Sequence, residues 1–145
     1  MPHVESIIIR PVKKGEPVRK QEVNITPLGI EGDHSAKPDG KRPVTLISAS
    51  ALAAAAASIG FEGDVHVACR RNILIDHLPE ENMEGKIISI GKEVVLEITE
   101  YAKPCKRMDE NFGEGGVEAL FEKAGWGAKV ISPGSIAVGD VVLLQ

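Results

Sequence analysis

The stretch that decides the fold runs from Ile87 to Thr99 and has the sequence IISIGKEVVLEIT. It contains two short runs rich in β-branched residues, Ile87–Ile90 and Val94–Thr99, and such runs favour extended strands. Gly91 and Lys92 lie between the two runs, and glycine supplies the special backbone dihedrals that tight connections need. The stretch therefore predicts two neighbouring strands joined by a hairpin.

Similar short strands are predicted on both sides of this hairpin, because Gly and Pro divide the chain into short apolar segments. These predicted strands cover Val4–Arg10, Val18–Ile25, Val44–Ile47, Arg71–Ile75, Ala128–Ile131, Ser135–Val138 and Val141–Leu144. The strands do not alternate with helices, which disfavours a doubly wound parallel sheet. We expect a mainly β fold, arranged as a closed or nearly closed barrel.

Two short helices are predicted at the periphery of this barrel. Residues 48–59 include seven alanines among twelve residues, and Gly60 follows them. Alanine is the best helix former and glycine commonly ends a helix. A second helix is expected over residues 115–124. No internal repeat or linker divides the sequence, so residues 1–145 are predicted to form a single domain.

The composition excludes several classes of function. The chain has 17 basic and 21 acidic residues, a net charge of −4, and aromatic residues make up 3% of it. Nucleic-acid binding needs a basic face and stacking rings, and both are scarce here. The alanine-rich run at residues 51–57 is shorter than the ~20 apolar residues of a membrane span. No secretory signal is evident, so we expect a cytoplasmic protein without nucleic-acid or membrane partners.

Cys105 is the residue most suited to chemistry. It follows the predicted strand Val94–Thr99, and Lys103, Lys106 and Arg107 flank it in the sequence. Nearby cations favour the thiolate over the thiol, and the thiolate is the reactive form. The alternative is a small hydrophobic side chain at the edge of a strand, a common role for free cysteines.

Two further segments carry candidate binding groups. Arg70 and Arg71 precede Asn72, and two guanidiniums beside an amide could clamp a phosphate or another oxyanion. The alternative is a solvated start of a strand. The loop Gly29–His34 contains Asp33 but matches neither a Walker loop nor a dinucleotide fingerprint.

The other thiol and the histidines point to no metal site. There is no Cys-x-x-Cys motif and no pair of histidines at helical ligand spacing, which disfavours structural zinc. Cys105 could form a nucleophile–base pair with His34 or His66. A reducing cytoplasm disfavours a disulfide between Cys69 and Cys105.

Taken together, these segments resemble a MOSC domain, the family named after the C-terminal domain of molybdenum cofactor sulfurase. The matching motifs follow one another in this order: Gly29–Asp33, Arg42 with Val44–Ile47, Arg70–Ile75, Gly85–Gly91, Val94–Thr99 leading to Pro104-Cys105, and Gly134–Val141. The resemblance implies a β-barrel with small peripheral helices. Family members often have Gly-Asp-Arg-His where this chain has Gly32-Asp33-His34-Ser35.

The resemblance also implies a function. In this family the cysteine that matches Cys105 either carries sulfur or ligates molybdenum held by a pterin dithiolene, and a soft thiolate suits both roles. We therefore expect a protein that binds the molybdenum cofactor, with reduction of N-hydroxylated compounds as its reaction and Cys105 as catalytic residue and metal ligand. The cofactor-binding residues implied are Asp33, Arg70, Arg71, Asn72, Lys103, Lys106 and Arg107.

Two alternatives stay open beside this molybdenum-dependent oxidoreductase. In the first, a sulfur transferase, Cys105 accepts persulfide sulfur from a desulfurase, and pyridoxal phosphate belongs to that partner. In the second, the protein carries the cofactor without turnover. Two cysteines cannot hold an iron–sulfur cluster unaided. The expected partners are therefore a small-molecule substrate or cofactor and either a separate electron donor or a desulfurase.

Overall fold

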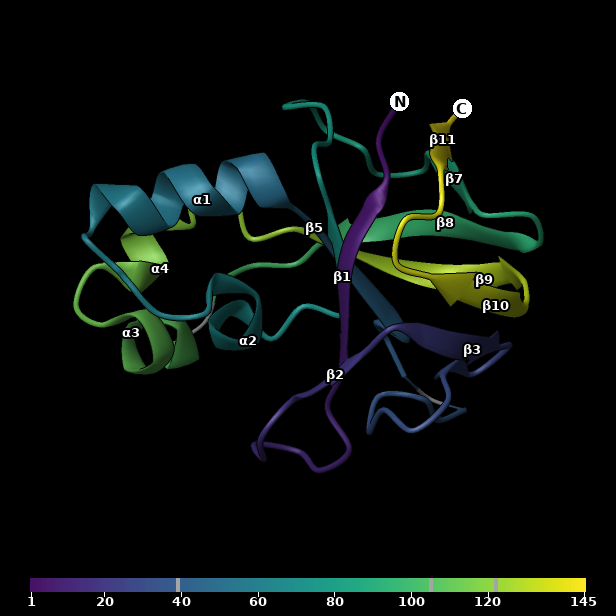
Figure 1. Ribbon diagram of the computed structural model, residues 1–145, viewed down its shortest axis with the longest axis horizontal. Coiled ribbons are helices and arrows are strands. Elements are labelled where there is room, and N and C mark those ends of the chain that lie inside the picture. The colour runs from purple at the N-terminus through teal and green to yellow at the C-terminus, as the bar shows by residue number, and fades with distance from the viewer. Residues whose placement is uncertain (39, 105, 122) are drawn as a thin grey trace.

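The computed structural model describes residues 1–38, 40–104, 106–121 and 123–145. Its helices gather at one end of the molecule and most strands at the other, with the two chain ends close together (Figure 1). The elements in chain order are β1 Val4–Ile9, β2 Val18–Lys20, β3 Glu22–Thr26, β4 Gly29–Ile30, β5 Val44–Ser48, α1 Ala49–Ser58, α2 Val65–Cys69, β6 Ile73–Ile75, β7 Ile87–Ile90, β8 Val94–Tyr101, α3 Lys106–Phe112, α4 Gly116–Ala119, β9 Trp126–Ser132, β10 Gly134–Ala137 and β11 Val142–Leu144.

The strands of the described residues form two sheets. One has eight strands in the order β11-β7-β8-β9-β5-β6-β1-β2, and the other has three in the order β10-β3-β4. The predicted hairpin is confirmed, since β7 and β8 pair antiparallel with Ile90 opposite Val94. The ladder between β5 and β6 is parallel, so the larger sheet is mixed.

The mainly β composition and the peripheral helices are confirmed, but the predicted closed barrel is wrong. In the part of the chain that the structure describes, both sheets stay open. The strand β1 pairs with β6 over residues 4–7 on one edge and with β2 over residues 7–9 on the other. The beginning of β1 and the residues before it meet the segment 139–142. The contacts are a bridge between His3 and Val141, hydrogen bonds of Val4 with Gly139 and Asp140, and a hydrogen bond from Val142 N–H to the Pro2 carbonyl. In the described residues these contacts include an isolated bridge but no strand ladder, so they do not close the larger sheet.

The strands β5 and β6 separate two apolar cores. Leu46 and Ile73 belong to the core between the sheets, whereas Ile47 and Leu74 pack against the helices. Strands buried on both faces have continuous apolar runs instead of alternating ones. Asn72 lies directly before β6, so its side chain lies close to both apolar cores.

The longer predicted helix is confirmed as α1. Its N-cap is Ser48, whose Oγ accepts a hydrogen bond from Ala51 N–H at 3.4 Å. Leu52 and two alanines of α1 are buried against the rest of the protein. Small side chains let the helix lie close to its neighbours. In the described residues no helix has the length and apolar character needed to cross a membrane.

The other helices differ from the predictions. Only residues 116–119 of the predicted segment 115–124 are α-helical. Leu120 is the C-cap, and its carbonyl accepts a hydrogen bond from the Tyr101 hydroxyl. The helices α2 and α3 were not predicted, since five to seven residues are too few to display a helical period. The predicted strand Val18–Ile25 divides at Gln21 into β2 and β3, which belong to different sheets.

Candidate functional site

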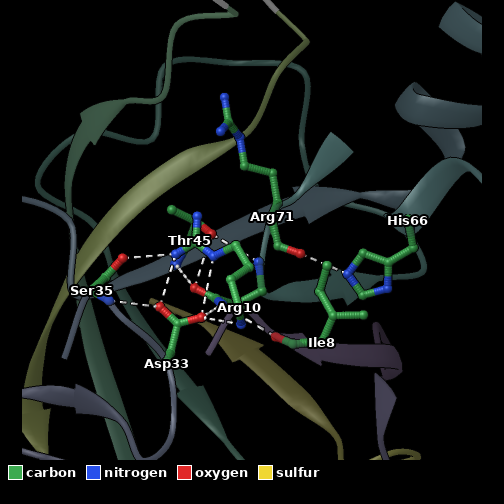
Figure 2. Close-up of polar contacts among 8 residues, drawn as sticks. Ile8, Arg10, Asp33, Ser35, Thr45, His66 and Arg71 are labelled. Carbon is green, nitrogen blue, oxygen red and sulfur yellow. Dashed lines mark hydrogen bonds and ion pairs between the residues drawn. The ribbon is translucent and has the colours of Figure 1, made fainter. Parts of the chain in front are cut away.

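A buried ion pair connects the end of β1 to the loop after β4 (Figure 2). The Arg10 Nη2 atom lies 3.0 Å from Asp33 Oδ2, and the Asp33 side chain is fully buried. The same carboxylate accepts hydrogen bonds from the backbone N–H groups of Arg10, at 2.7 Å, and Ser35, at 3.0 Å. Several donors therefore compensate the charge of a carboxylate that water cannot reach.

Asn72 extends this network into the sheet. Its side-chain nitrogen donates to Asp33 Oδ1, at 3.0 Å, and to the Ile8 carbonyl, at 3.2 Å. Its side-chain oxygen accepts from the backbone N–H and the hydroxyl of Thr45, both at 3.1 Å. Asn72 is fully buried. The amide thus ties β1, β5 and the Asp33 loop to the chain just before β6.

The charges in this network fix the ionisation of Asp33. Burial alone would raise the pKa of the carboxyl group, but the hydrogen bonds and the positive charge of Arg10, with the N–H of Ser35, outweigh it. The pKa of Asp33 is consequently lowered, and the ion pair persists at neutral pH. The cofactor-binding roles of Asp33 and Asn72 stay predictions. In this structure their polar atoms bond to protein groups.

Arg71 holds the segment that leads to Cys105. Its Nε donates to the Ala124 carbonyl at 2.8 Å, and its Nη2 donates to the carbonyls of Ala102, at 3.1 Å, and Lys103, at 3.2 Å. In Figure 2 its side chain extends away from the Asp33 network. Arg71 is largely buried. This guanidinium therefore fastens two turns of the backbone together.

The two neighbouring arginines bond to different parts of the chain. Arg70 ends α2 in the left-handed conformation, with φ of 59°. Its guanidinium donates to the Gly15 carbonyl, in the turn between β1 and β2. In the described contacts the two guanidiniums therefore bond to different backbone segments, and the cofactor-binding roles of Arg70 and Arg71 stay predictions.

The predicted reactive segment is only partly described. Cys105 lies outside the described residues, as do the side chains of Lys106 and Arg107. The helix α3 begins at Lys106, directly after Cys105 in the sequence. The side chain of Lys103 is exposed, and its carbonyl is one of those that Arg71 binds. The roles of these four residues stay predictions.

Cys69 is a structural thiol. It is completely buried in the core between the helices and β6, and its Sγ donates to the His66 carbonyl at 3.2 Å. Burial raises the pKa of the Cys69 thiol to about 11. Because the thiolate is the reactive form, Cys69 is inert at neutral pH.

His66 is a buried neutral imidazole. Its Nε2 lies 2.8 Å from the Arg71 carbonyl, which can only accept, so Nε2 carries the proton. The Nδ1 atom lies 2.9 Å from Ser6 Oγ and accepts the hydroxyl proton. Burial lowers the pKa of His66 to about 4. Both ring nitrogens are thus engaged in holding α2 to β1 and to the chain before β6.

We expect His66 to make the protein less stable in acid. The unfolded chain binds a proton at an ordinary pKa near 6.5, whereas the folded chain binds it only near pH 4. Stability is therefore lost as the pH falls from about 6.5 to about 4, by about 3 kcal/mol in all. Urea unfolding of wild type and His66→Gln across this range tests the expectation. The variant should lack this part of the loss, whereas His77→Gln, at an exposed position, should retain it. Equal acid losses in wild type and His66→Gln would contradict it.

A cleft of about 670 Å³ opens beside the backbone that Arg71 holds. Tyr101 and Gly125 line it, and they are the chain neighbours of Ala102 and Ala124, whose carbonyls bind Arg71. The described residues in its wall are Ser48, Ala51, Leu78, Pro79, Glu80, Glu81, Asn82, Glu84, Tyr101, Phe121, Lys123, Gly125 and Trp126. The cleft therefore adjoins the segment that leads to Cys105.

Sequence reasoning missed the structural partners of the residues that it selected. The sequence patterns placed Arg10 and Thr45 only in strands. In the structure Arg10 bonds to Asp33, and Thr45 bonds to Asn72. A charged residue at the end of an apolar run, such as Arg10, is only a weak signal of a buried ion pair. Among the described residues, no group of three or more His, Cys, Asp or Glu side chains could hold a metal ion.

Comparisons with known proteins identify the family of the chain. The fold is similar to that of the YuaD protein from Bacillus subtilis, with 16% sequence identity over 99% of this chain and 96% of that chain, and a TM-score of 0.84. It is also similar to YiiM from Escherichia coli, with 20% identity over 99% of this chain and 69% of that chain, and a TM-score of 0.73. No curated protein sequence matches the chain. A family model for the MOSC domain matches residues 27–143, and the chain therefore belongs to the MOSC domain family.

Proposed function

We propose that this chain binds the molybdenum cofactor through Cys105 and reduces N-hydroxylated compounds. The observation that carries the proposal is the contact of Arg71 with the carbonyls of Ala102 and Lys103, just ahead of Cys105. A backbone held in this way provides a fixed support for a metal-binding thiolate. Membership of the MOSC family supports the same function.

The donor chemistry of residues 103–107 fits the cofactor. A thiolate is a soft ligand that suits the metal. Lys103, Lys106 and Arg107 supply positive charge for the phosphate of the pterin. The network around Asp33 and Asn72 fits it less well, because its donors already bond to protein acceptors. We therefore expect the 103–107 segment to hold the cofactor, with Arg71 as a positioning residue.

The residues of the chain have limited tasks in this reaction. The cofactor, when bound, supplies the two-electron redox chemistry. An N–OH substrate takes up two electrons and two protons, the N–O bond breaks, and an N–H product and water leave. Lys103, Lys106 and Arg107 bind anionic groups and keep the Cys105 thiol ionised. A separate protein donor delivers the electrons.

The test of this function compares the two cysteines of the chain. Protein made in a cofactor-producing host is analysed for molybdenum and assayed for amidoxime reduction with a chemical electron donor. We expect Cys105→Ala to lose both metal and activity by a factor of roughly 100 or more. Cys69→Ala, which removes the inert buried thiol, should retain both. Absence of molybdenum in loaded wild type, with activity indifferent to Cys105→Ala, would contradict the proposal. Bound cofactor without turnover would favour a carrier.

A sulfur-transfer function is the second candidate, and the burial of Cys69 favours it. The thiolate of Cys105 would attack the outer sulfur of a desulfurase persulfide, forming a new persulfide on Cys105 and releasing the desulfurase thiolate. Cys69 is fully buried and protonated, so it could not reduce that persulfide. Incubation with a desulfurase and cysteine should then add the mass of one sulfur atom to wild type and none to Cys105→Ala. Wild type without this adduct would exclude the candidate.

A further inference from the structure

Aromatic side chains are concentrated in the wall of the 670 Å³ cleft. Of the five aromatic residues in the chain, Tyr101, Trp126 and Phe121 line it. Tyr101 and Trp126 are opposite each other in the β8–β9 ladder, with ring centroids 5.6 Å apart and ring planes at 70°. The Phe121 side chain is 66% exposed. In a chain so poor in aromatic residues, this wall has the composition of a ligand site, and its volume lies in the usual range.

The backbone around these rings is held rigidly. The Tyr101 hydroxyl donates to the Leu120 carbonyl, at 3.3 Å, and accepts from Ala124 N–H, at 3.4 Å. Gly125 has a φ of +95°, and a Cβ at this position would lie 2.2 Å from the Leu46 carbonyl oxygen. Only glycine allows this close approach of β9 to β5. The wall is therefore formed before any ligand arrives, which lowers the entropy cost of binding.

The charge of the cleft is negative. Glu80, Glu81 and Glu84 line it, against Lys123. Glu81 also pairs with Lys86 at 3.3 Å, outside the wall. Glu80 and Glu84 are exposed residues that line the same cleft as the three aromatic residues. Such a wall repels a phosphate and attracts a cation.

We propose that this cleft binds a small organic cation with an apolar body, of the class of aryl-substituted quaternary ammonium ions. Aromatic faces attract such cations through their quadrupoles, and carboxylates add charge complementarity. The rings of Tyr101, Trp126 and Phe121 contact the alkyl and aryl surface, and Glu80 and Glu84 compensate the charge. The site adjoins the Cys105 segment but needs neither metal nor cofactor.

Equilibrium binding to the full-length protein tests the proposal. Trp126 is the single tryptophan of the chain and reports on the cleft through its fluorescence. The probe is benzyltrimethylammonium, and benzyl alcohol and benzoate are its neutral and anionic comparators. We expect the cation to bind at least tenfold more tightly than either comparator, and more weakly as salt is added. Equal or tighter binding of benzyl alcohol or benzoate would overturn the proposal.

Substitutions locate the binding site. Phe121→Ala and the double variant Glu80→Gln/Glu84→Gln should each weaken cation binding by a factor of roughly three to ten. The matched control is Glu31→Gln/Glu62→Gln, which removes two exposed carboxylates outside the cleft and should change nothing. Unchanged affinity in both cleft variants would overturn the proposal. Because the measurement uses no metal and no electron donor, its failure leaves the proposed function standing, and the reverse also holds.

Discussion

Replacement of Asp33 by alanine should lower the free energy of unfolding by about 3–5 kcal/mol, the largest loss of stability that we expect from a single substitution. The Asp33 side chain is fully buried and that of Arg10 is only 10% exposed. Removing the carboxylate therefore leaves a guanidinium charge with little access to water. It also removes the acceptor for the side-chain nitrogen of Asn72 and for two backbone N–H groups.

Denaturant unfolding measures this loss, and a surface ion pair supplies the control. Glu97 lies 3.7 Å from Lys129, and both side chains are partly exposed. Glu97→Ala should cost less than about 1 kcal/mol. The double variant Arg10→Met/Asp33→Leu should be more stable than Asp33→Ala, because it removes both charges together. An Asp33→Ala variant no less stable than Glu97→Ala would contradict our interpretation of the network.

Local sequence patterns were sufficient for the elements with strong periodic signals. Residues close together in the sequence determine the hairpin of β7 and β8, through its β-branched runs, and the helix α1, through its alanines. These elements form as expected. The open sheet could not be predicted in this way. Closure depends on whether β11 forms a ladder with β1. In the described residues β1 pairs instead with β2 and with the distant strand β6, and an isolated bridge joins the segments that precede β1 and β11.

The candidate site shows the same limit more sharply. Asp33 was selected through the resemblance to the MOSC family, and Asn72 through that resemblance and its place beside two arginines. The structure joins their side chains at 3.0 Å. A single sequence contains no signal that residues so far apart would bond to each other. Arg70 and Arg71 are adjacent, so the pattern suggested a joint clamp. The left-handed conformation of Arg70 accompanies a sharp change in chain direction, and the two guanidiniums bond to different turns.

Arg71→Met should have the second large effect, on both stability and the Cys105 segment. The guanidinium makes three hydrogen bonds to the carbonyls of Ala102, Lys103 and Ala124. Hydrogen bonds to charged groups contribute about 1.5–3 kcal/mol each, and their loss is not additive. We expect a loss of at least about 3 kcal/mol in the free energy of unfolding. Under the proposed function, in which Arg71 positions the segment that carries a metal ligand, molybdenum content and amidoxime reduction should fall by a factor of roughly 10–100.

A readout beyond stability distinguishes positioning from a general structural role. The rate at which iodoacetamide alkylates Cys105 reports on the segment that Arg71 holds, because Cys69 is buried and inert. At a temperature where the variants stay folded, Cys105 of Arg71→Met should be alkylated at a different rate from Cys105 of wild type. Arg71→Lys, which retains the charge but not the fork of donors, should restore only part of the difference. The control Arg19→Met removes a half-exposed arginine paired with Asp64. Its Cys105 should be alkylated at the wild-type rate. If Arg71→Met matched wild type in alkylation rate and metal content, the three carbonyl contacts would stabilise the fold without orienting the thiol. The support for Cys105 would then have to come from α3 and not from the end of β8.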